Sequence, residues 1–194
     1  MQKHLFLTGS AGCGKSEAIR SALGPALLGA GGFVTKNEKG EDGVLLRSLL
    51  LPTAAAGGAE GFEALPYLDL RGETALHDSE VFRSEGVRLL EEAAWYPFSV
   101  LDAIGGFELL IPQFRTALAE LLSSEQPLLG VLLARKDAEA LCHRLGLGER
   151  VERNIAQLWM ALEADSDTLI VQLSGLHRKN TLRTLNRWVE EYAR

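Results

Sequence analysis

A glycine-rich segment near the start of the chain constrains the fold more than any other feature of the sequence. Residues 9–16 read Gly-Ser-Ala-Gly-Cys-Gly-Lys-Ser, which fits the spacing G-x-x-x-x-G-K-[ST]. Residues 5–8 are a short apolar run that predicts a buried strand, and residues 17–23 have the apolar spacing of a helix. A strand, a glycine turn and a helix therefore follow one another in the order that a phosphate-binding loop requires.

The residue types in this segment suit a nucleoside triphosphate. Gly9, Gly12 and Gly14 lack a Cβ atom, so successive backbone N–H groups can converge on a phosphate at the positive end of the helix. Lys15 would place a positive charge between the β- and γ-phosphates, and the Ser16 hydroxyl would bind the accompanying Mg²⁺. The alternative is a glycine turn that only begins a helix. We expect the whole segment to bind nucleotide, that is Gly9, Ser10, Ala11, Gly12, Cys13, Gly14, Lys15 and Ser16.

The composition is that of an ordinary globular chain. Its 194 residues are 46% hydrophobic and 24% charged, which predicts one domain over residues 1–194. No apolar stretch approaches bilayer length and no signal peptide is recognised, so we expect a cytoplasmic protein without a membrane partner. The net charge of -6 argues against a nucleic-acid partner. Cys13 and Cys142 have neither disulfide nor zinc spacing, which fits a reducing compartment.

The order of the predicted elements indicates an α/β protein with a mainly parallel sheet flanked by helices. The predicted strands cover residues 5–8, 33–35, 44–51, 99–102, 128–133 and 168–173. The predicted helices lie near residues 17–23, 79–94, 114–122, 137–145, 155–162 and 182–192.

Four details of this organisation can be tested. Residues 33–35 and 44–51 flank a polar, glycine-rich turn and predict a β-hairpin after the first helix. Residues 29–32 predict a flexible link, and residues 53–61 predict a surface loop. Asp137 is expected to cap the helix that follows it.

Asp102 supplies the second element that phosphate chemistry needs. It follows a hydrophobic strand, and the carboxyl ends of strands form the edge at which open α/β sheets bind their ligands. We therefore expect Asp102 to hold Mg²⁺ together with Ser16. The alternative role is a turn cap before Gly105 and Gly106.

These residues resemble a known family, the small P-loop nucleoside-triphosphatases and nucleotide-kinase-like proteins of thermophiles and animals, called cancer-related nucleoside-triphosphatases in animals. The resemblance implies a three-layer, RecA-like P-loop fold and slow hydrolysis of ATP, GTP and other triphosphates with Mg²⁺ as cofactor. Besides the phosphate loop, the matching positions are residues 32–35 (G-F-x-T in the family), Val81, Phe82, Gly86, Leu90, residues 102–109 (D-E-I-G-K-M-E-L in the family), Phe114 and Pro127.

The departures from the family pattern fall on the chemistry. Ala103 stands where the family has a glutamate that is thought to activate the attacking water, and Gly106 replaces a lysine. Residues 36–39 read Lys-Asn-Glu-Lys where the family has x-E-V-R, and the hairpin lacks the usual second arginine. A positioned base typically increases a rate by a factor of about 10²–10⁴. The rate of hydrolysis is therefore expected to be lower than in the family unless another group replaces the glutamate.

Three further residues are candidates by position. Glu108 is the matching acid that could substitute for the missing glutamate, and its alternative role is a surface carboxylate or a hydrogen-bond partner of the nearby glycines. Arg135 follows a predicted strand and could stabilise the γ-phosphate as an arginine finger, or it could be solvated. Arg178 lies in residues 177–180, which resemble the family's polar N-R turn near the base, or form a surface turn.

The expected catalytic residues are therefore Lys15, Asp102, Glu108 and Arg135, with Arg178 as an additional nucleotide-binding residue. Three functions fit them. The first is slow hydrolysis of a magnesium triphosphate. The second is a phosphotransferase with an unidentified acceptor, and the third is a regulatory module that binds nucleotide without turnover. Base preference and oligomeric state are not indicated by any motif.

Overall fold

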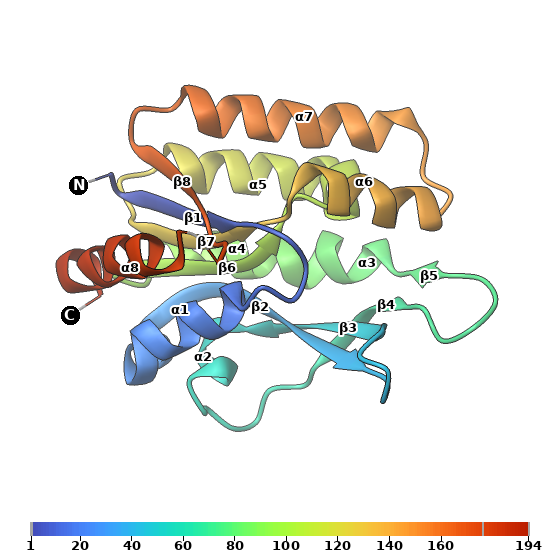
Figure 1. Cartoon of the computed structure of the whole chain (residues 1–194), viewed down its shortest axis with the longest axis horizontal. Coiled ribbons are helices and arrows are strands. Elements are labelled where there is room, and N and C mark those ends of the chain that lie inside the picture. Colours follow the sequence, from blue (N-terminus) through green and yellow to red (C-terminus); the bar gives the residue numbers. More distant parts are fainter. Residues whose placement is uncertain (1, 176, 194) are drawn as a thin grey trace.

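The sheet is the frame of the molecule. The computed structural model describes residues 2–175 and 177–193, and its described residues form an eight-stranded sheet in the order β5-β4-β3-β2-β6-β7-β1-β8 (Figure 1). The strands are β1 (His4–Thr8), β2 (Ala30–Lys39), β3 (Leu45–Pro52), β4 (Leu65–Asp69), β5 (Leu76–His77), β6 (Phe98–Ile104), β7 (Leu128–Leu132) and β8 (Thr168–Gln172).

Helices and short helical turns connect the strands. The helices are α1 (Lys15–Leu23), α2 (Thr53–Ala56), α3 (Ser79–Val81), α4 (Val87–Ala93), α5 (Pro112–Ser123), α6 (Arg135–Arg144), α7 (Glu149–Ala164) and α8 (Arg178–Tyr192). The helical turns are η1 (Gly24–Gly29) and η3 (Phe107–Leu110), both of the 3-10 type, and the π turn η2 (Phe82–Gly86).

The sheet has a parallel part and an antiparallel part. Strands β8, β1, β7, β6 and β2 run parallel to one another, whereas β2, β3, β4 and β5 form antiparallel pairs. Parallel neighbours need crossover helices, while antiparallel neighbours need only turns. The predicted fold class, a mainly parallel α/β sheet with a hairpin after the first helix, is confirmed.

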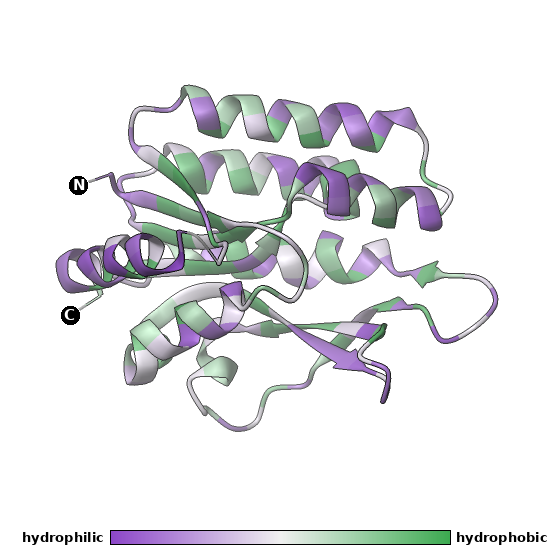
Figure 2. Cartoon of the chain, viewed as in Figure 1, coloured by the Kyte–Doolittle hydropathy of each residue, from purple (hydrophilic) through white to green (hydrophobic). Residues whose placement is uncertain are grey.

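Helices cover both faces of the parallel part because successive side chains of a strand point to opposite faces. Phe6 packs in the cluster that faces α4, α5 and α7, whereas Leu5 and Leu7 pack in the cluster that faces α1 and α8. Figure 2 shows hydrophobic residues along the central strands and mainly hydrophilic ones on α8. Burial on both faces explains why these strands are continuous apolar runs in the sequence.

The glycines at positions 29–32 were predicted to be a flexible link, and that prediction is wrong. Strand β2 begins at Ala30, so Gly31 and Gly32 lie in the sheet. A Cβ atom on Gly31 would lie 2.8 Å from the Cα atom of Ala93. A Cβ atom on Gly32, whose φ is +86°, would lie 2.3 Å from the carbonyl oxygen of Val100. These glycines allow α4 and β6 to approach β2 closely.

The region after the hairpin also differs from the prediction. The predicted surface loop at residues 53–61 begins with the helix α2, whose Thr53 side chain is buried and donates to the carbonyl oxygens of Gly31 and Val100 at 3.0 and 3.2 Å. Strands β4 and β5 were not predicted at all. They extend the antiparallel edge, where Leu68 is buried while Pro66 remains exposed.

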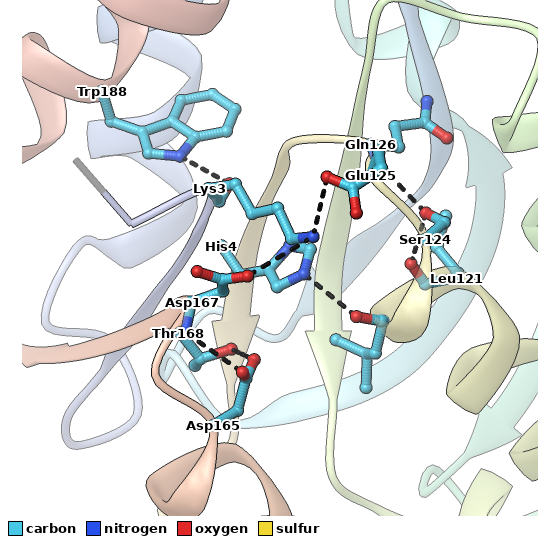
Figure 3. Close-up of polar contacts among 11 residues, drawn as sticks. Lys3, His4, Leu121, Ser124, Glu125, Gln126, Asp165, Asp167, Thr168 and Trp188 are labelled. Carbon is cyan, nitrogen blue, oxygen red and sulfur yellow. Dashed lines mark hydrogen bonds and ion pairs between the residues drawn. The ribbon is translucent and has the colours of Figure 1, made fainter.

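The amino-terminal end of β1 is held by polar contacts (Figure 3). The Lys3 ammonium lies 3.4 Å from a carboxylate oxygen of Glu125 and 3.5 Å from one of Asp167, and the Trp188 indole N–H donates to the Lys3 carbonyl oxygen at 3.0 Å. His4 is buried, and its Nε2 atom donates to the carbonyl oxygen of Leu122 at 3.1 Å. Burial lowers the pKa of His4, which keeps the imidazole neutral.

None of the described helices combines the length and the apolar character that a membrane-spanning helix requires.

Candidate functional site

The phosphate loop connects β1 to α1 at the carboxyl edge of the sheet. Gly9, Gly12 and Gly14 have φ values of 138°, 76° and 93°, which only glycine adopts without strain. A Cβ atom on Gly9 would also lie 2.7 Å from the carbonyl oxygen of Leu173. The glycine spacing in the sequence is therefore a requirement of this turn, which delivers the chain into the first turn of α1 with its free N–H groups.

The Lys15 side chain is folded back onto this loop. Its Nζ atom donates to the carbonyl oxygens of Gly9 at 2.7 Å and Ser10 at 2.9 Å, and it lies 3.7 Å from the Cys13 sulfur. The side chain is largely buried against the loop. The ammonium group thus stays beside the loop, where its partners are neutral carbonyl oxygens.

Ser16 and Asp102 meet at the start of α1. The Ser16 hydroxyl donates to the Oδ1 atom of Asp102 at 3.1 Å, across 86 residues of sequence. Asp102 lies on β6, which is separated from β1 by β7, so the parallel strands bring both residues to the same edge. The Asp102 side chain is 7% exposed, and burial raises its pKa to about 6, against the lowering effects of Ser16, Arg20 and Lys15. The peptide bond between Asp102 and Ala103 is cis.

This pair has the donor chemistry that suits Mg²⁺. A hydroxyl and a carboxylate are hard oxygen ligands, and a buried carboxylate with a raised pKa is stabilised by a nearby cation. Among the described residues there is no group of three or more His, Cys, Asp and Glu side chains that could hold a metal ion. Mg²⁺ in nucleotide sites commonly uses one or two protein ligands, with phosphates and water completing its shell. The residues present therefore fit the ion.

Arg178 reaches the loop from the opposite end of the chain. It begins α8, and its guanidinium donates to the carbonyl oxygen of Cys13 at 3.2 Å. A Cβ atom on Gly14 would lie 3.6 Å from the nearest guanidinium nitrogen. Arg178 is exposed, so the fold brings a cation that remains open to solvent beside the phosphate loop.

Glu108 serves the backbone of its own segment. Its Oε1 atom accepts hydrogen bonds from the Gly105 and Gly106 N–H groups, both at 2.7 Å, and the side chain is 4% exposed. Burial raises the pKa of Glu108, and the two N–H donors oppose that rise. A Cβ atom on Gly106 would lie 2.9 Å from the other carboxylate oxygen, so the departure from the family lysine also leaves room for Glu108.

Arg135 is engaged by α7. Its guanidinium lies 5.1 Å from the ring centre of Trp159 and 3.4 Å from a carboxylate oxygen of Glu163. Both contacts are on α7. Among the described residues, no hydrogen bond or ion pair joins Arg135 to the phosphate loop. Of the predicted site residues, Lys15, Ser16, Asp102 and Arg178 are joined by contacts around the loop, while Glu108 and Arg135 are held elsewhere.

Asp137 corrects one prediction and adds a residue to the site. It does not cap its helix, because α6 begins at Arg135 with Ala134 as the N-cap. Instead, its Oδ2 atom accepts a hydrogen bond from the Ala11 N–H of the phosphate loop at 3.0 Å. Like Asp102, Asp137 follows a parallel strand at the carboxyl edge, in its case β7, which lies between β1 and β6. The sequence pattern around Asp137 is that of a helix cap, so this role in the loop was not predicted.

Tyr67 is a second residue that the sequence did not indicate, since β4 itself was not predicted. Its hydroxyl lies 3.3 Å from the Thr35 hydroxyl oxygen. Burial raises the pKa of Tyr67 to about 12, and the nearby carboxylates of Glu108 and Asp102 add to the rise. The phenol therefore stays protonated beside the two acids.

Comparison with known proteins agrees with this geometry. A family model described as NTPase matches residues 4–153, which is more than half of the chain. The crystal structure of THEP1 from the hyperthermophile Aquifex aeolicus is similar over 98% of this chain and 99% of that chain, with a TM-score of 0.65 and 14% sequence identity, a level that speaks for the fold alone. No curated protein matches the sequence. The chain belongs to the NTPase family, among the small P-loop NTPases.

Proposed function

We propose that this protein binds a magnesium nucleoside triphosphate, ATP or GTP, at residues 9–16 and hydrolyses it slowly to the diphosphate and phosphate. The observation that carries the proposal is the 3.1 Å contact between Ser16 and Asp102, formed at the start of α1 beside Lys15. A hydroxyl, a carboxylate and an ammonium group at a helix N-terminus are the groups that hold Mg²⁺ and the phosphates in P-loop enzymes. Membership of the NTPase family supports the same activity.

The roles follow from the contacts of each residue. Ser16 and Asp102 would hold Mg²⁺, which when bound neutralises charge on the β- and γ-phosphate oxygens. Lys15 would exchange the carbonyl oxygens of Gly9 and Ser10 for phosphate oxygens, a gain because both partners are then charged. Arg178 would neutralise nucleotide charge from the other side of the loop.

Two candidate residues would have to change partners to take part. The Oε1 atom of Glu108 would have to leave the N–H groups of Gly105 and Gly106 before it could accept a proton from water. Arg135 would have to leave Trp159 and Glu163 to reach a γ-phosphate. We still propose both as catalytic residues, but Lys15 and Asp102 come first because they already lie at the loop.

A second function is favoured by one observation. Ala103 has no group that can accept a proton, and the matching acid Glu108 is already bonded to backbone N–H groups. Loss of a positioned base lowers a rate by about 10²–10⁴. A nucleotide-binding regulatory module that has lost turnover would have this set of residues.

Phosphate release from Mg-ATP and Mg-GTP tests the proposal, with Lys15→Ala and Ala103→Glu measured beside the natural protein. We expect Lys15→Ala to reduce release to background, because it removes the charge between the β- and γ-phosphates. Ala103→Glu is expected to raise the rate about tenfold or more, since Ala103 is only partly buried and the new carboxylate would stand where the family has its base.

The outcomes separate the two functions. If the Lys15→Ala variant released phosphate as fast as the natural protein, hydrolysis at this loop would be contradicted. Tight binding without release, restored to turnover by Ala103→Glu, would select the regulatory module. Absence of binding of either nucleotide at millimolar concentration would refute both.

A further inference from the structure

One backbone amide of the phosphate loop already has an anionic partner. Ala11 is the third residue of the phosphate loop, and its N–H donates to the Asp137 carboxylate at 3.0 Å, across 126 residues of sequence. A carboxylate oxygen and a phosphate oxygen make the same kind of charge-assisted hydrogen bond with a backbone N–H. Asp137 therefore offers the loop a bond of the type that a nucleotide would offer.

This use of Asp137 is not what its own helix would predict. A carboxylate in the first turn of a helix commonly reaches back to the N-terminal N–H groups of that helix. The N-cap of α6, Ala134, accepts the Asp137 backbone N–H at 2.9 Å but gives no side-chain cap. The acid side chain crosses to the phosphate loop instead.

The contact can open without moving the helix. Ala138, the next residue, is fully buried in the core, so the first turn of α6 is anchored there. Asp137 is half-buried and Ala11 is exposed, so water can replace each partner once they part. A rotation of the Asp137 side chain is then enough to free the loop.

Lys15 is in a matching state. Its ammonium donates to the carbonyl oxygens of Gly9 and Ser10. The Ala11 N–H and the Lys15 ammonium therefore both have hydrogen-bond partners within the protein. A triphosphate would compete with both internal contacts. It would also face the negative charge of Asp137 at close range, which disfavours binding until that side chain turns away.

We propose that Asp137 is an internal competitor for the phosphate loop, a latch that holds the Ala11 N–H until a nucleoside triphosphate displaces it. The proposal rests on the proposed nucleotide function and adds a regulation of the same site. A latch closed in about nine of ten molecules raises the measured Kd about tenfold, because only the open molecules bind. Removing it should therefore tighten nucleotide binding, whereas removing an ordinary ligand residue would weaken it.

Titration calorimetry with Mg-ATP and with Mg-GTP tests the latch, using the natural protein, Asp137→Ala, Asp137→Asn and Glu139→Gln. We expect Asp137→Ala to lower the Kd by roughly 3- to 10-fold. Asp137→Asn keeps an acceptor for Ala11 but loses the charge, so a smaller decrease is expected. Glu139→Gln makes the same charge change at an exposed position of α6 and should leave the Kd unchanged.

Hydrogen exchange of the nucleotide-free proteins supplies a second readout. Exchange over residues 9–14 should be faster in Asp137→Ala than in the natural protein, because the Ala11 N–H loses its acceptor. If Asp137→Ala does not fold, as thermal unfolding would show, Asp137→Asn carries the calorimetric measurement, and Asp137→Ser, whose shorter side chain withdraws the acceptor from Ala11, carries the exchange measurement.

The results distinguish the latch from the site on which it rests. Equal or weaker binding by Asp137→Ala, with binding by the natural protein intact, overturns the latch and leaves the nucleotide site standing. Unchanged exchange over residues 9–14 overturns it as well. Absence of binding by every variant overturns the nucleotide site and the latch together, whereas binding that is detected only in Asp137→Ala supports both.

Discussion

Replacing Asp102 by Asn should stabilise the nucleotide-free protein at alkaline pH, although it removes a residue that the proposed function needs. The Asp102 carboxyl is 7% exposed, and burial raises its pKa from 3.8 to about 6. The Ser16 hydroxyl and the charges of Arg20 and Lys15 favour the ionised form but do not overcome the burial. A charge is therefore kept in a place where water solvates it poorly.

The size and sign of the effect follow from linkage. The folded protein holds this proton more tightly than the unfolded chain, so the destabilisation is absent below pH 3.8, grows between 3.8 and about 6, and is complete above that value. The difference of about two pKa units corresponds to about 3 kcal/mol. Asparagine keeps the shape and an acceptor for Ser16 without the charge. The gain from Asp102→Asn is therefore expected to be about 2–3 kcal/mol larger at pH 8 than at pH 4.

Urea unfolding in EDTA measures this difference in the metal-free protein. The midpoints of Asp102→Asn and the natural protein are compared at pH 4 and pH 8, with Glu139→Gln, an exposed acid on α6, as the matched control. The control should shift the free energy of unfolding by less than about 0.5 kcal/mol at both pH values. A gain from Asp102→Asn that is the same at pH 4 and pH 8 would refute the reasoning. In separate samples without EDTA, Mg-ATP should protect the natural protein from urea but not the variant.

Two further predictions concern the sheet itself. Gly130→Ala should lower the free energy of unfolding by about 2 kcal/mol, because the new Cβ atom would lie 2.5 Å from the Phe6 ring in a closely packed core. A urea midpoint equal to that of the natural protein would contradict this. His4→Gln should reduce the loss of stability between pH 7.5 and pH 5. Buried His4 has a lowered pKa, so its contribution is present above its ordinary value of 6.5 and is lost as the pH falls. A stability loss of equal size in the variant and the natural protein would argue against this role.

The site residues that were predicted from the sequence lie in contiguous motifs or directly after a predicted strand. The phosphate loop is a contiguous segment whose glycines have a conformational reason, so its position and its strand and helix neighbours were predicted from spacing alone. Asp102 was predicted by a topological rule, namely that parallel strands share a carboxyl edge. Its contact with Ser16 required no side-chain information beyond that rule.

The parts that were not predicted depend on contacts between distant segments. Asp137 has the sequence context of a helix cap, and only the packing of α6 beside the loop turns it toward Ala11. Gly31 and Gly32 lie in a glycine-rich stretch that is typical of a flexible link. In the structure they are in β2, where the close approach of α4 and β6 leaves no space for a Cβ atom. Strand β4, which lies between β3 and β5, has one buried residue, Leu68, among less buried neighbours, and its five residues are too few for a periodic signal.

The acids at the carboxyl edge explain why binding and turnover can separate in this chain. Asp102 accepts from Ser16, Glu108 from Gly105 and Gly106, and Asp137 from Ala11, so each of these three carboxylates already has a donor in the structure. A carboxylate oxygen that already holds such a donor must exchange it for water before it can act as a base, and the exchange costs most where the carboxylate is buried, as Glu108 is. The Asp137 contact is exposed, so water can replace its donor, and in the proposed latch this release serves entry of the phosphate chain. Under the proposed function, the contacts of this edge therefore favour nucleotide capture over rapid hydrolysis.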